Sequence, residues 1–476
     1  METVKQSLRE SAKLRWIALA IVSFTMFCGY YFEKATSAFK PALESAAGDW
    51  VPWTSTQFGF FRFSYMWLNV FAGMLVIGGI ILDKKGIRFA GVMATIIMVC
   101  GAAICGGALW CGYWFTIPNE VWGISMPFAG TWRFPVTTQM WMACCGFAIF
   151  CMGDEIAGIT VSKTIVKWFK GKEMALAMGL EMASARMGTA LAMACSLPIA
   201  LKWGVPAPVL LGVALLTIGM LSFVGYTRMD KRLDASEPPA PVTAGGDSEE
   251  AFKWSDILDI VKNRGFWLIA ILCVLFYSAV FPFLDYATDL MVNKYGLDKN
   301  YAGYIPAMLP FGNILLTPVF GSIYDRKGKG ATIMALGAVL LILVHVIFSI
   351  PALAHWGYAV FAVLILGVGF SLVPSAMWPS VPKLIPERQL GTAYAMIFFI
   401  QNIGLGLVPL LIGWVLDRFC KVGERVTVTG SEPMYNYMWP MVIFTVFGVL
   451  ALIVAMMLKS ADRRKGYGLE MPNIKK

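Results

Sequence analysis

Two oppositely charged residues, Glu155 and Arg186, stand in long apolar runs of the sequence. Glu155 is followed by Ile-Ala-Gly-Ile-Thr-Val-Ser, and Arg186 lies within Met-Ala-Ser-Ala-Arg-Met-Gly-Thr-Ala. An ionisable side chain inside a membrane is costly to bury, so such a residue is a candidate for function. A carboxylate can hold an ammonium group, and a guanidinium can hold a carboxylate through two parallel hydrogen bonds. The two residues therefore indicate either a site for a small zwitterion, such as a short peptide or an amino acid, or a structural ion pair between two helices.

Further charged residues fall within or near the ends of apolar runs: Glu33, Arg62, Asp154, Asp285 and Asp289. We expect Glu33, Asp285 and Asp289 to be solvated caps at outer helix ends, and Arg62 either to reach outward to the interface or to act inside the membrane. Asp154 is turned by about 100° from Glu155 on a helix, so the two cannot face one cavity equally well. If the protein binds or moves protons, the candidate proton sites are Glu155, Asp154, Glu33 and Asp285, because the chain has only two histidines.

Five uncharged residues are candidates for the wall of the same cavity. Tyr30, Tyr277 and Trp378 are amphipathic aromatic residues, for which packing or interface anchoring is the usual role. Gln401 and Asn402 are polar residues in the middle of an apolar run, where lipid offers no hydrogen-bond partner. We therefore expect the two amides to bond a substrate or a neighbouring helix, and the three aromatic residues to contact the substrate.

The composition of the chain excludes several classes of protein. Of its 476 residues, 58% are hydrophobic and 14% are charged, and the mean hydropathy is +0.67. Soluble domains carry about a quarter charged residues, so a soluble enzyme and a disordered chain are excluded. The net charge of +10 comes in short bursts, unlike the basic face of a nucleic-acid-binding protein. The ten cysteines lack metal-binding spacing and there is no phosphate-binding glycine loop. We expect no enzymatic activity, no metal and no cofactor.

Apolar runs of about 20 residues, the length that spans a bilayer, recur along the chain. Twelve spans are predicted near 14–34, 57–82, 89–113, 134–158, 173–199, 206–227, 266–291, 300–323, 330–350, 356–381, 390–416 and 435–459. A polar stretch rich in Pro and Gly follows the sixth span, and residues 254–261 after it form a possible interfacial helix. The predicted organisation is a tail (1–13), six spans (14–227), a linker (228–265), six spans (266–459) and a second tail (460–476).

Lysine and arginine residues set the expected orientation. If the N-terminus lies inside, the inner segments hold roughly three times as many of these residues as the outer segments. Both termini and the linker are therefore expected in the cytoplasm, and the net positive charge reflects membrane topology more than a binding partner.

A short motif repeats after the second and the eighth predicted spans. The first copy is Gly79-x-x-x-Asp83-Lys84-Lys85-Gly86-x-Arg88, and the second is Gly321-x-x-x-Asp325-Arg326-Lys327-Gly328-Lys329. Glycine lets helices approach closely in lipid, and the aspartate can pair with a cation at the membrane face. Two copies at equivalent positions resemble the cytoplasmic loop motif of the major facilitator superfamily. The resemblance implies an all-α polytopic membrane protein with twelve transmembrane helices in two six-helix bundles, alternating access, and a gating role for both copies.

Longer stretches are similar to a narrower family. They are Trp168-Phe169-Lys170-Gly171-Lys172-Glu173, Gln389-Leu390-Gly391-Thr392-Ala393-Tyr394 and Ile400-Gln401-Asn402-Ile403-Gly404. They resemble the lysosomal dipeptide transporters of animals and their bacterial relatives. The resemblance implies dipeptides as the substrate, with Glu155 at the amino end and Arg186 at the carboxyl end. Asp154 and Arg62 depart from the family pattern, which could alter the accepted side chains or add a coupling site.

The animal family depends on a glycosylated partner in the lysosome, but this chain carries no Asn-x-Ser/Thr sequon and no obvious dileucine signal. We therefore expect a monomer in a bacterial inner membrane, without an obligatory protein partner. Its expected binding partners are lipid, the substrate and, if transport is coupled to protons, protons. One alternative is a carrier for an organic anion or a sugar acid, with Arg186 as anion anchor and Glu155 as proton site. Another is a sensor that binds without transporting.

Overall fold

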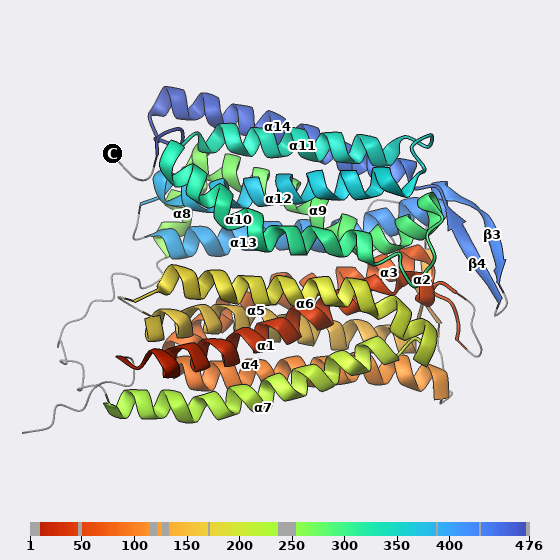
Figure 1. Ribbon diagram of the computed structural model, residues 1–476, viewed down its shortest axis with the longest axis horizontal. Coiled ribbons are helices and arrows are strands. Elements are labelled where there is room, and N and C mark those ends of the chain that lie inside the picture. Colours follow the sequence, from red (N-terminus) through yellow and green to blue (C-terminus); the bar gives the residue numbers. More distant parts are fainter. Residues whose placement is uncertain are drawn as a thin grey trace, which may run out of the picture.

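Long helices run side by side in two groups, one from each half of the chain (Figure 1). The computed structural model describes residues 10–45, 50–114, 121–125, 133–169, 172–236, 254–386, 389–427 and 430–472. The first half holds α1 (Ala12–Ala38), α2 (Lys40–Leu43), α3 (Ser55–Phe63), the π-helical turn η2 (Trp67–Phe71), α4 (Met74–Trp114), α5 (Thr138–Phe169), α6 (Met174–Trp203) and α7 (Ala207–Ser236). The second half holds α8 (Trp254–Lys262), α9 (Arg264–Tyr295), α10 (Tyr304–Lys327), α11 (Gly330–Ser349), α12 (Trp356–Leu384), α13 (Leu390–Val415), the π-helical turn η4 (Leu416–Cys420) and α14 (Met438–Lys465).

The twelve predicted spans are confirmed as helices of the right length and composition. Eleven helices of the described chain are long and apolar enough to cross a membrane, and a bent pair raises the number to twelve. The bent pair, Ser55–Phe71 with Val76–Leu82, differs from the straight span predicted at 57–82 because its axis turns by 57°. Gly73 lies at this break with φ +63°, a backbone conformation that glycine adopts without strain. A second glycine with positive φ, Gly86, separates this span from the next one within α4.

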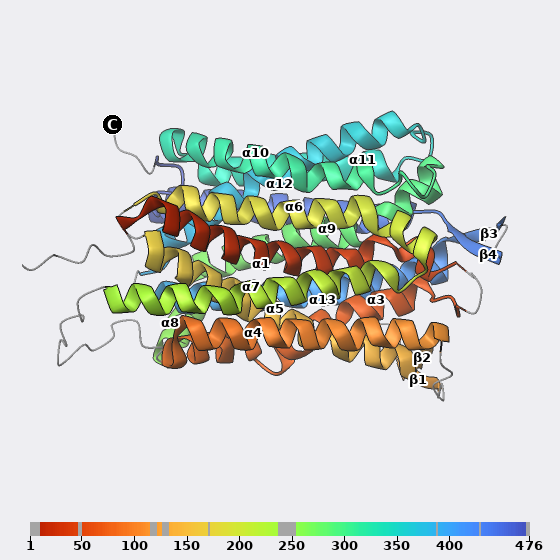
Figure 2. The same ribbon diagram turned by 60° about the horizontal axis from the view of Figure 1, so that its bottom comes forward.

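Two short β-hairpins, which the sequence analysis did not predict, lie in the connections between spans. The strands β1 (Val121–Ser125) and β2 (Arg133–Thr137) pair antiparallel, as do β3 (Lys421–Thr427) and β4 (Gly430–Tyr435). Both hairpins lie at one end of the helices, which we call the hairpin end (Figure 2). The opposite end, where α7 stops and α8 begins, is called the linker end; the linker residues 237–253 lie outside the described part of the chain.

The helix α9 is the most deeply buried of the predicted spans. The side chain of Asn263 caps its first turn by accepting a hydrogen bond from the Gly265 amide, and Gly296 ends it with φ +62°. Within its most apolar window, 72% of the residues are buried, against 28–67% for the other spans. A charged residue on α9 is therefore surrounded by protein on most sides.

The two halves touch closely at the hairpin end. A Cβ atom on Gly303 of α10 would lie 2.0 Å from the Met193 carbonyl oxygen of α6, and one on Gly413 of α13 would lie 2.1 Å from the Ser55 carbonyl oxygen of α3. Asp417 also accepts hydrogen bonds from the Ser55 and Thr56 amides, at 3.2 and 2.6 Å. The carboxylate thus satisfies free amides at the start of α3, where the helix dipole favours a negative charge.

At the linker end, corresponding helices leave space beside their glycines. Built Cβ atoms at Gly79, Gly179, Gly321 and Gly391, on α4, α6, α10 and α13, meet no heavy atom of the described residues within 4 Å. The hairpin end is therefore closed, whereas these four glycines of the linker end have no close neighbour, unlike Gly265 and Gly330 near the same end.

Candidate functional site

Glu155 on α5 lies at the boundary between the two halves. The Tyr65 hydroxyl, between α3 and η2, donates a hydrogen bond of 2.6 Å to the Glu155 carboxylate. The side chain of Asn402 on α13, in the other half, lies within interaction range of this carboxylate. Glu155 therefore connects two helices of its own half with one helix of the other.

Arg186 on α6 faces aromatic rings of the second half. Its guanidinium carbon lies 5.9 Å from the ring centre of Phe281 on α9 and 5.4 Å from that of Phe370 on α12. Such cation–π contacts favour the charge but leave the N–H groups of the guanidinium available for hydrogen bonds. Within the described residues, no hydrogen bond or ion pair joins Arg186 to Glu155, so the two charges do not form the structural ion pair that the sequence left open.

The candidate wall residues Tyr277 and Trp378 lie together. The Trp378 indole N–H donates a hydrogen bond of 3.1 Å to the Tyr277 hydroxyl, and the Tyr277 ring stacks on Phe281 at 5.5 Å. Tyr277 and Tyr30 of α1 are both within electrostatic range of Arg186. Tyr30 and Tyr277, from different halves of the protein, therefore lie in the neighbourhood of the guanidinium, and Trp378 contacts Tyr277.

The two amide candidates have different surroundings. Gln401 accepts a hydrogen bond of 3.2 Å from the Cys273 thiol of α9, within the second half. Asn402 contacts Glu155 across the boundary between the halves. Gln401 thus has a structural partner, and Asn402 is the amide that belongs to the Glu155 environment.

Asp154 occupies a separate position beside α1. One of its carboxylate oxygens is buried without a hydrogen-bond partner among the described residues. A Cβ atom on Gly29 would lie 2.2 Å from this oxygen, so the glycine provides the room for the carboxylate. Asp154 and Glu155 therefore have different neighbours, as their expected rotation around the helix requires.

The expectation of solvated caps near the hairpin end is wrong for Asp285 and Asp289, and Arg62 does not reach outward. The three residues are 4%, 3% and 4% exposed, respectively. Arg62 bonds Glu33 at 2.7 Å and Asp285 at 3.2 Å, and Lys34 bonds Asp285 at 3.0 Å. The cations of the first half form ion pairs with the carboxylates of the second half, and these ion pairs take the place of solvation by water. Only Glu33, at 15% side-chain exposure, keeps partial access to solvent.

The two copies of the repeated motif differ in their contacts. In the first, Arg88 pairs with Asp234 and Asp230 of α7, at 2.6 and 3.3 Å. Lys84 is exposed, and the side chain of Asp83 lies outside the described residues. In the second, Gly328 has φ +68° and faces the chain near Glu470, where a Cβ atom would lie 2.5 Å from a carbonyl oxygen. The gating role of Gly79, Gly321, Asp325, Arg326 and the other motif residues remains a prediction.

Sequence reasoning missed several residues of this region. Tyr65 and Phe370 were not among the candidates, because aromatic residues are frequent in the chain and no local pattern distinguishes these two. Their partners lie far away in sequence, so only the packing of the helices reveals them. No group of three or more metal-ligating side chains occurs within the residues that the structure describes.

Comparisons with known proteins agree with the fold. A twelve-span helical protein with charged residues at the boundary of its two halves has the architecture of a membrane transporter. The chain belongs to the Major Facilitator Superfamily, whose family model matches residues 121–409, more than half of its length. This confirms the predicted superfamily, and it confirms a transporter in place of an enzyme.

The curated relatives include the lysosomal dipeptide transporter MFSD1. The human protein is 27% identical over 414 residues, covering 85% of this chain and 80% of the relative. The zebrafish (Danio rerio) protein is 26% identical over 419 residues, covering 86% and 79%. The predicted similarity to this narrower family is therefore confirmed.

Solved structures share the fold. The nucleoside transporter NupG aligns with a TM-score of 0.68 at 14% identity, covering 94% of this chain and 99% of that one. The peptide transporter POT in complex with alafosfalin aligns with a TM-score of 0.67 at 14% identity, covering 95% of each chain. At such identities the likeness concerns the arrangement of helices.

Replacing Tyr65 with Phe is expected to weaken substrate binding without abolishing it. The change removes one hydrogen bond to Glu155, and a hydrogen bond to a charged group contributes about 1.5–3 kcal/mol. We expect roughly a tenfold rise in the apparent Kd, measured by titration of the purified protein. Tyr295→Phe is the matched control, because the Tyr295 hydroxyl has no hydrogen-bond partner in the described structure. Equal effects of the two changes would contradict a role for Tyr65 in orienting Glu155.

Proposed function

We propose that the protein carries dipeptides across a membrane by alternating access, with Glu155 and Arg186 as the two ends of the binding site. The observation that carries this proposal is that the two opposite charges, on neighbouring helices of one half, do not pair with each other. Each instead meets groups of the other half: Asn402 in one case, Phe281 and Phe370 in the other. Two separated opposite charges suit a ligand that carries an ammonium at one end and a carboxylate at the other.

Each charge has a defined task in this proposal. The Glu155 carboxylate would hold the peptide ammonium, with Tyr65 and Asn402 fixing its position. The planar Arg186 guanidinium would hold the peptide carboxylate through two parallel hydrogen bonds. The rings of Tyr277 and Trp378 would then contact peptide side chains, through apolar area that tolerates different residues. Two curated relatives, at 26–27% identity, are named dipeptide transporters, which supports the same substrate class.

We further propose that the linker end faces the cytoplasm, because that end carries the excess of Lys and Arg. The closed hairpin end would then be the outer end, and the substrate site would exchange with the cytoplasm in this state. Closing the linker end would bring its helix glycines into contact, with the two copies of the repeated motif acting there. The bacterial inner membrane, the monomeric state and coupling to protons remain predictions.

A carrier for organic anions is the second candidate, since no hydrogen bond or ion pair to Arg186 is seen among the described residues and one Asp154 carboxylate oxygen has no partner there. Arg186 would then anchor the anion, and a carboxylate on α5 would hold the proton. In this case the ammonium group of a substrate would be dispensable.

Thermal stabilisation of the purified protein distinguishes the two candidates. A ligand that binds only the folded state raises the Tm in proportion to the logarithm of its concentration. We expect free dipeptides to raise the Tm, and N-acetylated or C-amidated dipeptides to have no effect at equal concentration. Stabilisation by simple monocarboxylates without an amine, and by N-acetylated dipeptides, would contradict the dipeptide proposal and favour the anion carrier.

A further inference from the structure

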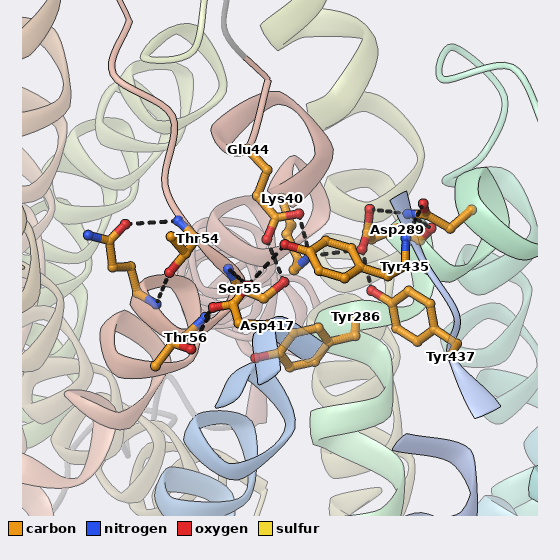
Figure 3. A network of polar contacts seen from close by, with 12 residues as sticks. Lys40, Glu44, Thr54, Ser55, Thr56, Tyr286, Asp289, Asp417, Tyr435 and Tyr437 are labelled. Carbon is orange, nitrogen blue, oxygen red and sulfur yellow. Dashed lines mark hydrogen bonds and ion pairs between the residues drawn. The ribbon is translucent and has the colours of Figure 1, made fainter. Parts of the chain in front are cut away.

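Two carboxylates of α9, Asp285 and Asp289, hold the hairpin end closed. They are one helical turn apart, and both bond cations of the first half. Asp285 accepts from Lys34 at 3.0 Å and from Arg62 at 3.2 Å. Asp289 accepts from Lys40 of α2 at 2.8 Å, in the polar network of Figure 3. These ion pairs cross the boundary between the halves, so opening the hairpin end must break them.

The ion-pair partners in this region are divided unequally between the two halves of the protein. Each cation has a second carboxylate on its own half: Glu33 lies 2.7 Å from Arg62 and 3.1 Å from Lys34, and Glu44 lies 2.6 Å from Lys40. On the second half, Asp289 has only neutral partners, the Tyr437 hydroxyl and the Asn293 amide at 2.9 Å. No cation of the second half bonds Asp285 or Asp289 among the described residues.

Other charged and ionisable groups surround the two carboxylates. The charged groups of the first half come from α1 (Glu33 and Lys34), α2 and its end (Lys40 and Glu44) and α3 (Arg62). Those of the second half are Asp417 of η4, Lys299 before α10, Arg425 of β3 and Glu432 of β4. The phenols of Tyr286, Tyr435 and Tyr437 complete the set, and Figure 3 shows them around Lys40, Glu44 and Asp289. Burial raises the pKa of the Glu44 carboxyl to about 8, against the opposing effect of Lys40. Glu44 is therefore the main competitor as a proton-binding group.

Separation of the halves creates a charge imbalance. The first half keeps Lys34, Lys40 and Arg62 with Glu33 and Glu44, so each cation keeps a carboxylate neighbour, although Lys34 and Arg62 share Glu33. The second half keeps two carboxylates one turn apart without a cation bonded to either: Lys299 and Arg425 line a pocket beside Asp289, but Lys299 pairs with Glu432. Like charges at this helical spacing repel each other. Binding one proton between them would relieve that repulsion, as in other close pairs of carboxylates.

We propose that opening of the hairpin end turns Asp285 and Asp289 into an unpaired acidic pair that binds a proton from the compartment on that side. Acid in that compartment then favours the open state, which makes the pair a pH-sensitive gate. The inference rests on the proposed alternating access but not on the identity of the substrate. It adds a regulatory proton site at the hairpin end, separate from the substrate-binding residues.

The test measures opening without any substrate. Thr288 lies between the two aspartates and is 1% exposed, so a thiol in Thr288→Cys becomes accessible only when the hairpin end opens. Its labelling rate with a membrane-impermeant maleimide, resolved by peptide mass spectrometry in proteoliposomes, is divided by the rate at the exposed site Asn300→Cys. The division removes the dependence of the thiol reaction itself on pH. If opening takes up one proton, the ratio rises by up to about tenfold per pH unit.

We expect the ratio to rise at least about tenfold when the outer pH falls from about 7.5 to about 5.5. The rise should disappear in the double variant Asp285→Asn/Asp289→Asn. It should become smaller in the single variant Asp289→Asn, whose amide can still hydrogen-bond Tyr437 and Asn293. The single variant therefore provides a test if the double variant does not fold. The rise should persist in Glu44→Gln and in Asp298→Asn, an exposed carboxylate of the same half. A labelling ratio of the wild-type protein that does not change with pH would overturn the proposal. A rise that is abolished only by Glu44→Gln would also overturn it, and would identify Glu44 as the proton-binding group. Neither result depends on whether dipeptides are the substrate.

Discussion

Replacing Glu155 with Gln or Arg186 with Ala is expected to abolish saturable dipeptide transport in proteoliposomes, while the protein still folds and inserts. Each change removes the charge that would pair with one end of the peptide. Truncating one partner of a buried, hydrogen-bonded charge pair costs about 2–5 kcal/mol, which corresponds to a loss of at least about 30-fold in kcat/KM. Arg186→Lys should recover only part of the activity, because an ammonium cannot make the two parallel hydrogen bonds of a guanidinium.

Lys202→Gln is the matched control for Arg186, since Lys202 is an exposed cation on the same helix. We expect this control to transport at the wild-type rate. Wild-type transport of dipeptides by Glu155→Gln would contradict the proposed ammonium site. A Glu155→Gln protein that binds its substrate normally but no longer responds to a pH gradient would instead favour the anion carrier.

Replacing Arg62 with Ala should be strongly destabilising. The guanidinium bonds both Glu33 and Asp285 and lies 4.9 Å from the ring centre of Phe147. Removing one member of a buried ion network leaves carboxylates with fewer cations, and costs about 3–5 kcal/mol in comparable cases. We expect a clear drop in the Tm of the detergent-purified protein, and a smaller drop for Arg62→Lys.

The pair Lys421–Glu424 on the exposed β3 strand supplies the control. Its side chains are 45% and 54% exposed, and an exposed ion pair contributes about 1 kcal/mol or less. Lys421→Ala should therefore leave the Tm nearly unchanged. If Arg62→Ala and Lys421→Ala lowered the Tm equally, the buried network would not be what stabilises the closed hairpin end.

The helices could be predicted from the sequence in number and order, but some ends were missed: α5 and α7 continue to Phe169 and Ser236, beyond the predicted ends at 158 and 227. Apolar runs between polar connections determined the number and order of the spans, and α1 and α9 extend beyond their predicted ends by only a few residues. The 57° bend near Gly73 was not predicted, because an isolated glycine in an apolar run is compatible with a straight helix. The hairpins were missed as well: β1 and β3 lie in connections between spans, and most of β2 was assigned to the predicted span 134–158.

Charge in an apolar run was a good indicator of unusual residues but a poor indicator of their partners. Glu155 and Arg186 were selected on that ground, and the structure gives both of them neighbours from the other half. The same argument wrongly assigned Asp285 and Asp289 to solvent, because their cations are Lys34, Lys40 and Arg62, about 220–250 residues earlier in the chain. The packing of the two halves decides which helices face each other. The periodicity of residues within one helix carries no information about that packing.

Counterflow of labelled dipeptide into liposomes that contain only this protein is the most direct test of the central claim. The liposomes are loaded with unlabelled free dipeptide, N-acetylated dipeptide or C-amidated dipeptide. The account predicts saturable uptake of label with the free dipeptide inside, almost none with either blocked form, and none in Arg186→Ala. Uptake driven equally well by the N-acetylated form, or undiminished in Arg186→Ala, would contradict a site that holds both ends of a dipeptide.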